Sequence, residues 1–211
     1  MTNKLIIFTK APEPGQVKTR LIPALGAVNA AKLYHRLLIH TLQQHSKQQE
    51  YSIELCCTPD TNYPLFHTLQ KDYGCQLSVQ TGTDLGQRMH HALQQALTES
   101  PRAILIGCDC PLLSATDILQ GFELLAQDNE LVLGPAEDGG YVMIGLSSPH
   151  ESLFQGINWG SDQVYQQTIE RTNTLNIRHA SIASHWDLDL PEDLERLKAS
   201  PKHADLVKGL W

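Results

Sequence analysis

Short apolar runs alternate along the chain with longer stretches of helical periodicity. The short runs predict strands over residues 4–8, 53–58, 77–80, 103–106, 130–133, 141–146 and 177–182. Between them, apolar residues recur every three or four positions, which predicts helices over 30–44, 63–73, 83–98, 115–127 and 161–171. Because strands and helices alternate, we expect a layered α/β fold with a mostly parallel central sheet.

Local signals refine several of these elements. Residues 103–106 are apolar throughout, which is typical of a central parallel strand buried on both faces. Ser114 followed by Asp117 predicts a capping box at the start of helix 115–127. We expect Ser161 to cap the next helix, and Pro191 to open a last helix in its first turn.

Composition narrows the possible classes of protein. The 211 residues include 41% hydrophobic and 18% charged residues, which fits one globular domain spanning 1–211. The net charge of −7 argues against a nucleic-acid-binding surface, and no stretch is long and apolar enough for a membrane span. No signal peptide is visible, and the five cysteines do not suggest a disulfide framework, so we expect a cytoplasmic protein.

The first predicted strand runs into TKAPEPGQVKTRL at residues 9–21. Gly15 lets the backbone approach a ligand, while Lys18, Thr19 and Arg20 add two cations and a hydroxyl, and Lys10 adds a third cation. A strand followed by such a loop is a common way to hold phosphates. It is neither a Walker A loop nor a GxGxxG motif, and a solvated surface turn remains the alternative.

Carboxylates follow two other strand-like runs. Asp109 comes directly after residues 103–106, and Asp187 and Asp189 follow the last predicted strand. Because ligands bind beyond the carboxyl ends of parallel strands, Asp109 and one of the later acids could share Mg²⁺ with substrate phosphates. The alternative is that Asp187 and Asp189 only flank a helix start. Cys108 and Cys110 lack a partner pair for zinc, so we expect buried thiols.

Two further segments carry candidate chemistry for an acceptor. Asp138 precedes Gly139 and Gly140 between two predicted strands, so it could orient or deprotonate a hydroxyl, although the segment could also be a hairpin turn only. Trp159 offers a flat face for a sugar or base, or else is a buried core residue.

These motifs together resemble an uncharacterised bacterial glycosyltransferase-like family of the nucleotide-diphospho-sugar transferase superfamily. The resemblance covers essentially the whole chain and lies in KAPEPGQVKTRL (10–21), GTDLGQRM (82–89), GCDCP (107–111), GPAEDGGYVMIGL (134–146), NWGSDQV (158–164) and DLDLPEDL (187–194). It implies a three-layer α/β/α sandwich of the GT-A-like type. The chain is also similar to the molybdenum-cofactor and 2-phospho-lactate guanylyltransferases, which transfer a nucleotidyl group.

The resemblance also implies site residues. By this resemblance, Gly15, Lys18 and Arg20 would hold the phosphates, and Asp109 and Asp189 would hold Mg²⁺ or Mn²⁺. We further expect the nucleotide to contact Lys10, Ala11, Thr19, Gly86, Arg88 and Gly107, and the acceptor to contact Asp138, Gly139, Gly140 and Trp159. Lys18, Arg20 and Asp138 would be the catalytic residues. The expected partners are a nucleotide or nucleotide-sugar donor and a small-molecule acceptor.

The expected activity is transfer of a sugar from a nucleoside-diphosphate sugar, or of a nucleotidyl group from a nucleoside triphosphate. A non-catalytic nucleotide-binding protein is a second class. A third is a thiol redox or metal-thiolate protein built on Cys108 and Cys110.

Overall fold

A computed structural model describes residues 2–210 and contains one seven-stranded sheet in the order β3-β2-β1-β4-β6-β5-β7. Only β6 runs antiparallel to its neighbours, so the predicted mostly parallel sheet is confirmed. The strands are β1 (Asn3–Lys10), β2 (Tyr51–Thr58), β3 (Gln76–Val79), β4 (Ala103–Ile106), β5 (Leu131–Pro135), β6 (Tyr141–Leu146) and β7 (His179–Ser181).

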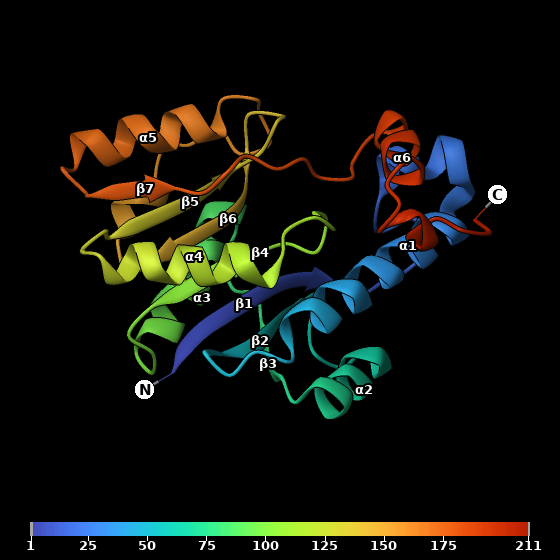
Figure 1. Cartoon of the computed structure of the whole chain (residues 1–211), viewed down its shortest axis with the longest axis horizontal. Coiled ribbons are helices and arrows are strands. Elements are labelled where there is room, and N and C mark those ends of the chain that lie inside the picture. The colour runs from blue at the N-terminus through green and yellow to red at the C-terminus, as the bar shows by residue number, and fades with distance from the viewer. Residues whose placement is uncertain (1, 211) are drawn as a thin grey trace.

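Helices cover both faces of this sheet, which gives three layers (Figure 1). One face packs against α1 (Ile22–His45), α2 (Pro64–Tyr73) and α4 (Ala115–Ala126). The other packs against α3 (Leu85–Leu97), the 3₁₀ helix η2 (Glu151–Phe154) and α5 (Val164–Thr174). The predicted α/β/α sandwich is therefore confirmed.

A third apolar cluster joins the two ends of the chain. The last helices, α6 (Pro191–Lys198) and η3 (Ala204–Leu206), pack against the first half of α1, beside the sheet rather than over it (Figure 1). Trp186 and Leu188, which precede α6, are buried in the same cluster. This contact brings the segment before α6 next to the loop after β1.

Several helix ends differ from the sequence-based expectation. Helix α1 begins at Ile22 rather than at residue 30, because Pro23 suits the first turn and a non-helical Gly26 (φ 75°) joins two helical pieces. The Ser114–Asp117 capping box is present as predicted. Ser161 is not the cap of α5; Gln163 is, because the Ser161 hydroxyl donates back to the Asn158 carbonyl.

Within residues 2–210, no helix combines the length and the apolar character needed to cross a bilayer.

Candidate active site

Lys18 connects the loop after β1 to the ends of two other segments. It adopts a left-handed backbone conformation (φ 48°) just before the 3₁₀ helix η1 (Thr19–Leu21), and its side chain is buried. Its Nζ lies 2.8 Å from Asp109 Oδ1 and also donates to the Leu188 carbonyl. Burial alone would lower the pKa of Lys18, but the charge and hydrogen bond of Asp109 outweigh it and the pKa is raised. Lys18 is therefore a fixed cation.

Arg20 makes a second link between the same segments. Its guanidinium lies 2.6 Å from the Asp189 carboxylate; the Arg20 side chain is exposed and that of Asp189 is half-buried. An exposed pair of this kind contributes little to stability and can be replaced by a competing anion.

The loop after β1 and the acids at the sheet edge enclose a polar cavity of about 220 Å³, which we call the loop pocket. It is lined by Lys10, Gln16, Val17, Lys18, Thr19, Arg20, Tyr34, Asp109 and Asp189. The structure thus brings together Lys10, Lys18, Thr19 and Arg20 with both predicted metal ligands. Ala11 is buried beside this pocket, and Gly15 (φ 83°) forms the exposed turn of the loop.

The segment before α6 crosses the carboxyl edge of the sheet. The Leu188 amide donates to the Asp109 carbonyl at 2.9 Å, and the Glu137 amide donates to the His185 carbonyl at 2.9 Å. Arg196 of α6 then forms a bidentate ion pair with Glu137, at 2.7 and 2.9 Å. Residues 185–190, which we call the strap, therefore contact three segments: the β5–β6 hairpin, the end of β4 and the loop after β1.

Asp187 lies on this strap in a crowded acidic environment. Burial, and then the nearby charge of Asp138, raise the pKa of Asp187 to about 6, and Asp109 adds to the effect. These three carboxylates come from the strap, the β5–β6 hairpin and the end of β4. The three carboxylates therefore interact at the carboxyl edge of the sheet although no two are neighbours in sequence.

The hairpin turn that carries Asp138 has a fixed backbone. The Asp138 carboxylate accepts from the Gly140 amide at 2.9 Å. Gly139 has φ 89°, and a Cβ added there would overlap the Asp162 carbonyl, so only glycine fits. The turn is a hairpin connection, as the alternative interpretation held, and the charge of its exposed Asp138 carboxylate acts on Asp187.

Trp159 and Gly86 form one packed unit. A Cβ on Gly86 would lie 2.6 Å from the Trp159 ring, and Trp159 meets Tyr141 edge to face at 6.5 Å. Trp159 is half-buried and packs against the apolar core, with Gly86 beneath its ring. Arg88 donates from Nε to the Gly82 carbonyl at 3.1 Å and so braces the start of α3. None of these three lines the loop pocket.

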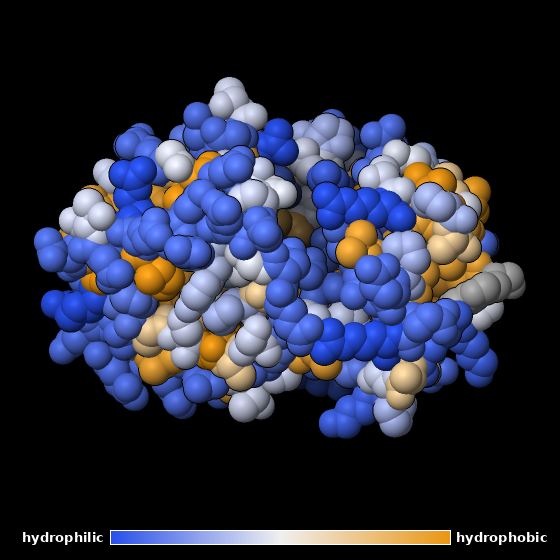
Figure 2. Space-filling model, turned by 90° about the horizontal axis from the view of Figure 1, so that it is seen from above, coloured by the Kyte–Doolittle hydropathy of each residue, from blue (hydrophilic) through white to orange (hydrophobic). Residues whose placement is uncertain are grey.

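A second cavity of about 260 Å³, the sheet-edge cavity, lies on the other side of Asp109. It is lined by Phe8, Leu85, Met89, Leu105, Gly107, Asp109, Cys110, Tyr141, Val142, Met143, Ile144 and Asp187. Figure 2 shows the surface hollowed near its middle, with hydrophobic atoms at the bottom of the hollow and hydrophilic atoms around it. Gly107, which was predicted to contact the nucleotide, lines this cavity. The apolar residues of the cavity wall were recognisable in the sequence only as parts of strands and helices, not as site residues.

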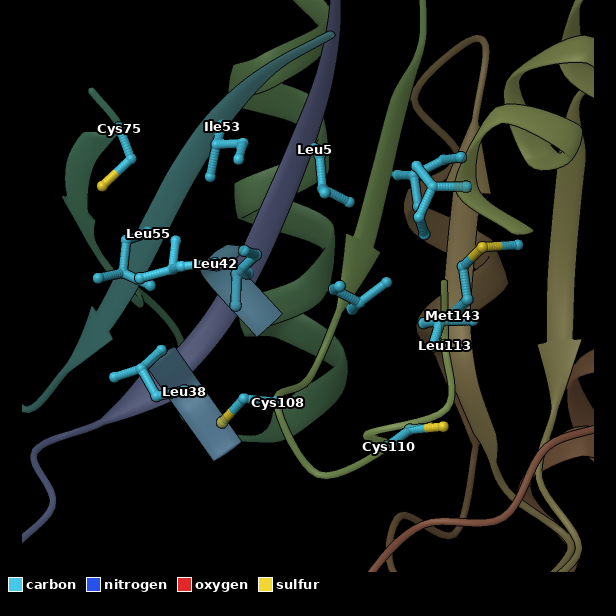
Figure 3. Packing of buried hydrophobic residues seen from close by; sticks show 14 of the residues in the cluster. Leu5, Leu38, Leu42, Ile53, Leu55, Cys75, Cys108, Cys110, Leu113 and Met143 are labelled. Carbon is cyan, nitrogen blue, oxygen red and sulfur yellow. The ribbon is translucent and has the colours of Figure 1, made fainter. Parts of the chain in front are cut away.

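Cys108 and Cys110 are buried, and their sulfur atoms point away from each other (Figure 3). Burial raises the pKa of both thiols to about 12. The expectation of buried thiols is confirmed, and a thiolate metal site on this pair has no support.

The residues at the strand ends fit a divalent cation bound together with phosphates. Among residues 2–210, no group of three or more His, Cys, Asp or Glu side chains is arranged to hold a metal ion alone. Asp109, however, has a buried Oδ1 that makes no hydrogen bond beyond its ion pair with Lys18. Asp187 is close to the carboxylates of Asp138 and Asp109, so a cation bound there would reduce the repulsion between them. One or two carboxylates plus substrate phosphates is the usual binding mode of Mg²⁺.

Tyr34 is a site residue that the sequence did not reveal. Its hydroxyl accepts from the Lys10 amide at 2.9 Å and its ring lines the loop pocket. In the sequence it is one more apolar position on the buried face of α1, so only the fold shows its second role.

A model of the bacterial family described as "Uncharacterized protein conserved in bacteria (DUF2064)" matches residues 41–161. A search of curated proteins found no match.

Solved structures show the same fold. A candidate nucleotide-diphospho-sugar transferase from Desulfovibrio desulfuricans G20 is 29% identical over 100% of this chain and 99% of its own, with a TM-score of 0.86. A cytidylyltransferase from Leptospira borgpetersenii is 14% identical over 99% and 93%, with a TM-score of 0.63. The Mycobacterium tuberculosis glucosyl-3-phosphoglycerate synthase, crystallised with Mn²⁺, uridine diphosphate and phosphoglyceric acid, is 10% identical over 93% and 74%, with a TM-score of 0.51.

Proposed function

This chain belongs to the bacterial DUF2064 family, and we propose that it is a divalent-cation-dependent transferase that uses a nucleotide-activated donor. The observation that carries the proposal is the loop pocket. There Lys10 at the end of β1, with Lys18 and Arg20 of the following loop, meets Asp109 and Asp189 at the carboxyl edge of the sheet. The Desulfovibrio and Leptospira proteins, which are transferases by name, support a transferase. The free, buried cysteines suit the reducing cytoplasm.

The donor phosphates would bind in the loop pocket. Lys18 is held in place by Asp109 and Leu188, so it offers a preorganised charge that needs no rearrangement on binding. Arg20 and Lys10 are exposed and can turn toward the ligand. A diphosphate would displace Asp189 from Arg20, because a phosphate offers the guanidinium a stronger bidentate partner.

The released Asp189, together with Asp109, would hold Mg²⁺ or Mn²⁺, and Asp187 is the nearest alternative ligand. When bound, the ion supplies positive charge that neutralises the donor phosphates. The chain itself contributes the fixed Lys18 charge and the strap that places all three acids at one edge.

Asp138 would handle the acceptor. A hydroxyl oxygen of the acceptor forms the bond to the transferred group, its proton passes to the Asp138 carboxylate, and the donor's bond to its leaving group breaks. The leaving group is a nucleoside diphosphate in sugar transfer and pyrophosphate in nucleotidyl transfer. The carboxylate is exposed and its turn is rigid, which suits proton transfer at a defined position.

Incubation with nucleoside triphosphates and nucleotide sugars in Mg²⁺ or Mn²⁺, followed by mass spectrometry, tests the proposal and identifies which group moves. A thermal-shift screen of the same panel first selects donors, because a ligand at 100 times its Kd stabilises by about 2.7 kcal/mol. Asp138→Asn should keep the thermal shift and lose product, whereas Asp109→Asn should lose product and the part of the thermal shift that depends on the divalent ion. Absence of any thermal shift across the panel would refute the proposal.

A further inference from the structure

The two cavities that meet at Asp109 have opposite charge. The loop pocket contains Lys10, Lys18 and Arg20, which outnumber its two acids. In the sheet-edge cavity, Asp109 and Asp187 are the only charged groups among the twelve lining residues, and none of the twelve is a lysine, arginine or histidine. The cations are therefore confined to one side of Asp109.

The walls of the sheet-edge cavity are apolar and firmly packed. They are formed by side chains from strands β1, β4 and β6 and from the first turns of α3: Phe8, Leu105, Met143, Ile144, Leu85 and Met89. Met89, Leu105, Met143 and Ile144 are at most 5% exposed. Leu85 stands at the rim and is 46% exposed. Trp159 braces the turn that carries Leu85, through its contact with Gly86.

This distribution decides what the cavity can accept. A phosphate ester placed here would bring further negative charge beside two carboxylates. No basic side chain lines the cavity, and the divalent ion proposed on Asp109 is already engaged by the donor phosphates. The Lys18 ammonium does not line this cavity: it lies on the loop-pocket side of Asp109, where it would meet the donor phosphates. An alcohol can donate its hydroxyl to a carboxylate at the polar end and place its carbon skeleton against the apolar walls.

We infer that the acceptor of this transferase is a phosphate-free, uncharged or cationic alcohol whose apolar portion fills the sheet-edge cavity. This inference rests on the proposed function and narrows its unknown substrate. In the transfer, the hydroxyl oxygen gains the donor's group, the donor's bond to its leaving group breaks, and the hydroxyl proton passes to Asp138. The Asp138 turn is joined to the segment that carries Asp187 by the hydrogen bond from the Glu137 amide to the His185 carbonyl.

A pair of matched probes tests the inference. Benzyl alcohol and benzyl phosphate share a ring that fits an apolar cavity and differ only in the phosphate. Their binding is measured by ligand-observed NMR on protein saturated with a nucleotide and Mg²⁺, so that the loop pocket is filled and cannot bind benzyl phosphate itself. We expect benzyl alcohol to bind at least about tenfold more tightly than benzyl phosphate.

Variants at the exposed rim position locate the effect in this cavity. Leu85→Lys adds a cation and should reduce the preference for the alcohol about fivefold or more, while Leu85→Gln, of similar size and no charge, should leave the preference unchanged. Leu85 lies outside the loop pocket, so nucleotide affinity should be equal in wild type and both variants.

Each other outcome overturns the inference. Equal or tighter binding of benzyl phosphate to the wild type would show that the cavity accepts phosphate. Loss of benzyl alcohol binding when nucleotide is added would show that the cavity holds the nucleoside of the donor. Equal effects of Leu85→Lys and Leu85→Gln would place the probe elsewhere. In all three cases nucleotide binding persists, so the proposed function stands; failure of nucleotide binding itself would be the failure of that function instead.

Discussion

Replacing Asp187 by asparagine should stabilise the ligand-free protein while impairing its function. Burial and the charge of Asp138 raise the pKa of Asp187 from 3.8 to about 6, so its ionised form is unfavourable in the folded state. Because the folded-state pKa exceeds the unfolded one, stability is greatest below the unfolded pKa and is lost as pH rises through the folded pKa. Asp187→Asn removes this loss.

The size of the gain follows from the shift. One pKa unit corresponds to about 1.4 kcal/mol, and the side chain keeps enough solvent contact that screening reduces the total, so we expect about 1–2 kcal/mol at pH 7.5. For a chain of this length that gain raises Tm by roughly 2–8 °C. Near pH 4 the Asp187 carboxyl is largely protonated in the folded protein, so most of the gain should disappear.

Thermal unfolding of both proteins at the two pH values, without divalent ions, measures this difference. Asp189→Asn is the matched control: it lies two positions away and its carboxylate is paired with Arg20, so it should give no gain at either pH. An unchanged or lower Tm of Asp187→Asn at pH 7.5, or an equal gain at pH 4, would contradict the reasoning.

Two further predictions concern the hairpin that carries Asp138. Gly139→Ala should lower the free energy of unfolding by about 2–4 kcal/mol in urea titrations, because the new Cβ would clash with the Asp162 carbonyl and the backbone has a positive φ. Gly160→Ala is the control: it has φ 87° but no atom within 4 Å, so it should cost only about 1 kcal/mol. Arg196→Gln should leave Tm nearly unchanged but reduce kcat severalfold by freeing Glu137, and adding Glu137→Gln should reduce it no further.

Much of the fold follows from local sequence patterns. The all-apolar run at 103–106 predicted a central strand, and parallel topology then placed Asp109 at the carboxyl edge, where the structure has it. The cationic loop after β1 was equally visible, because its chemistry lies in consecutive residues. Ser161 misled because a serine before a helix can donate to other backbone groups, as it does to Asn158.

The partnerships within the site were not predictable in the same way. Lys18 was predicted as a cation of a phosphate-binding loop, but its burial against Asp109 and Leu188 could not be predicted. Gly86 was predicted to lie in a helix and to contact the nucleotide, but its missing side chain makes room for Trp159. Such contacts join segments far apart in the sequence, and they depend on packing that no local periodicity contains.

The central claim is that the loop pocket binds nucleotide phosphates together with a divalent cation. Calorimetric titration of nucleoside di- and triphosphates, with and without Mn²⁺, into wild type, Arg20→Ala and Asp109→Asn tests it most directly. We predict binding that is strengthened by Mn²⁺ in the wild type, weaker binding to Arg20→Ala with the Mn²⁺ effect retained, and loss of the Mn²⁺ effect in Asp109→Asn. Equal affinities for all three proteins, with the same response to Mn²⁺, would contradict the account.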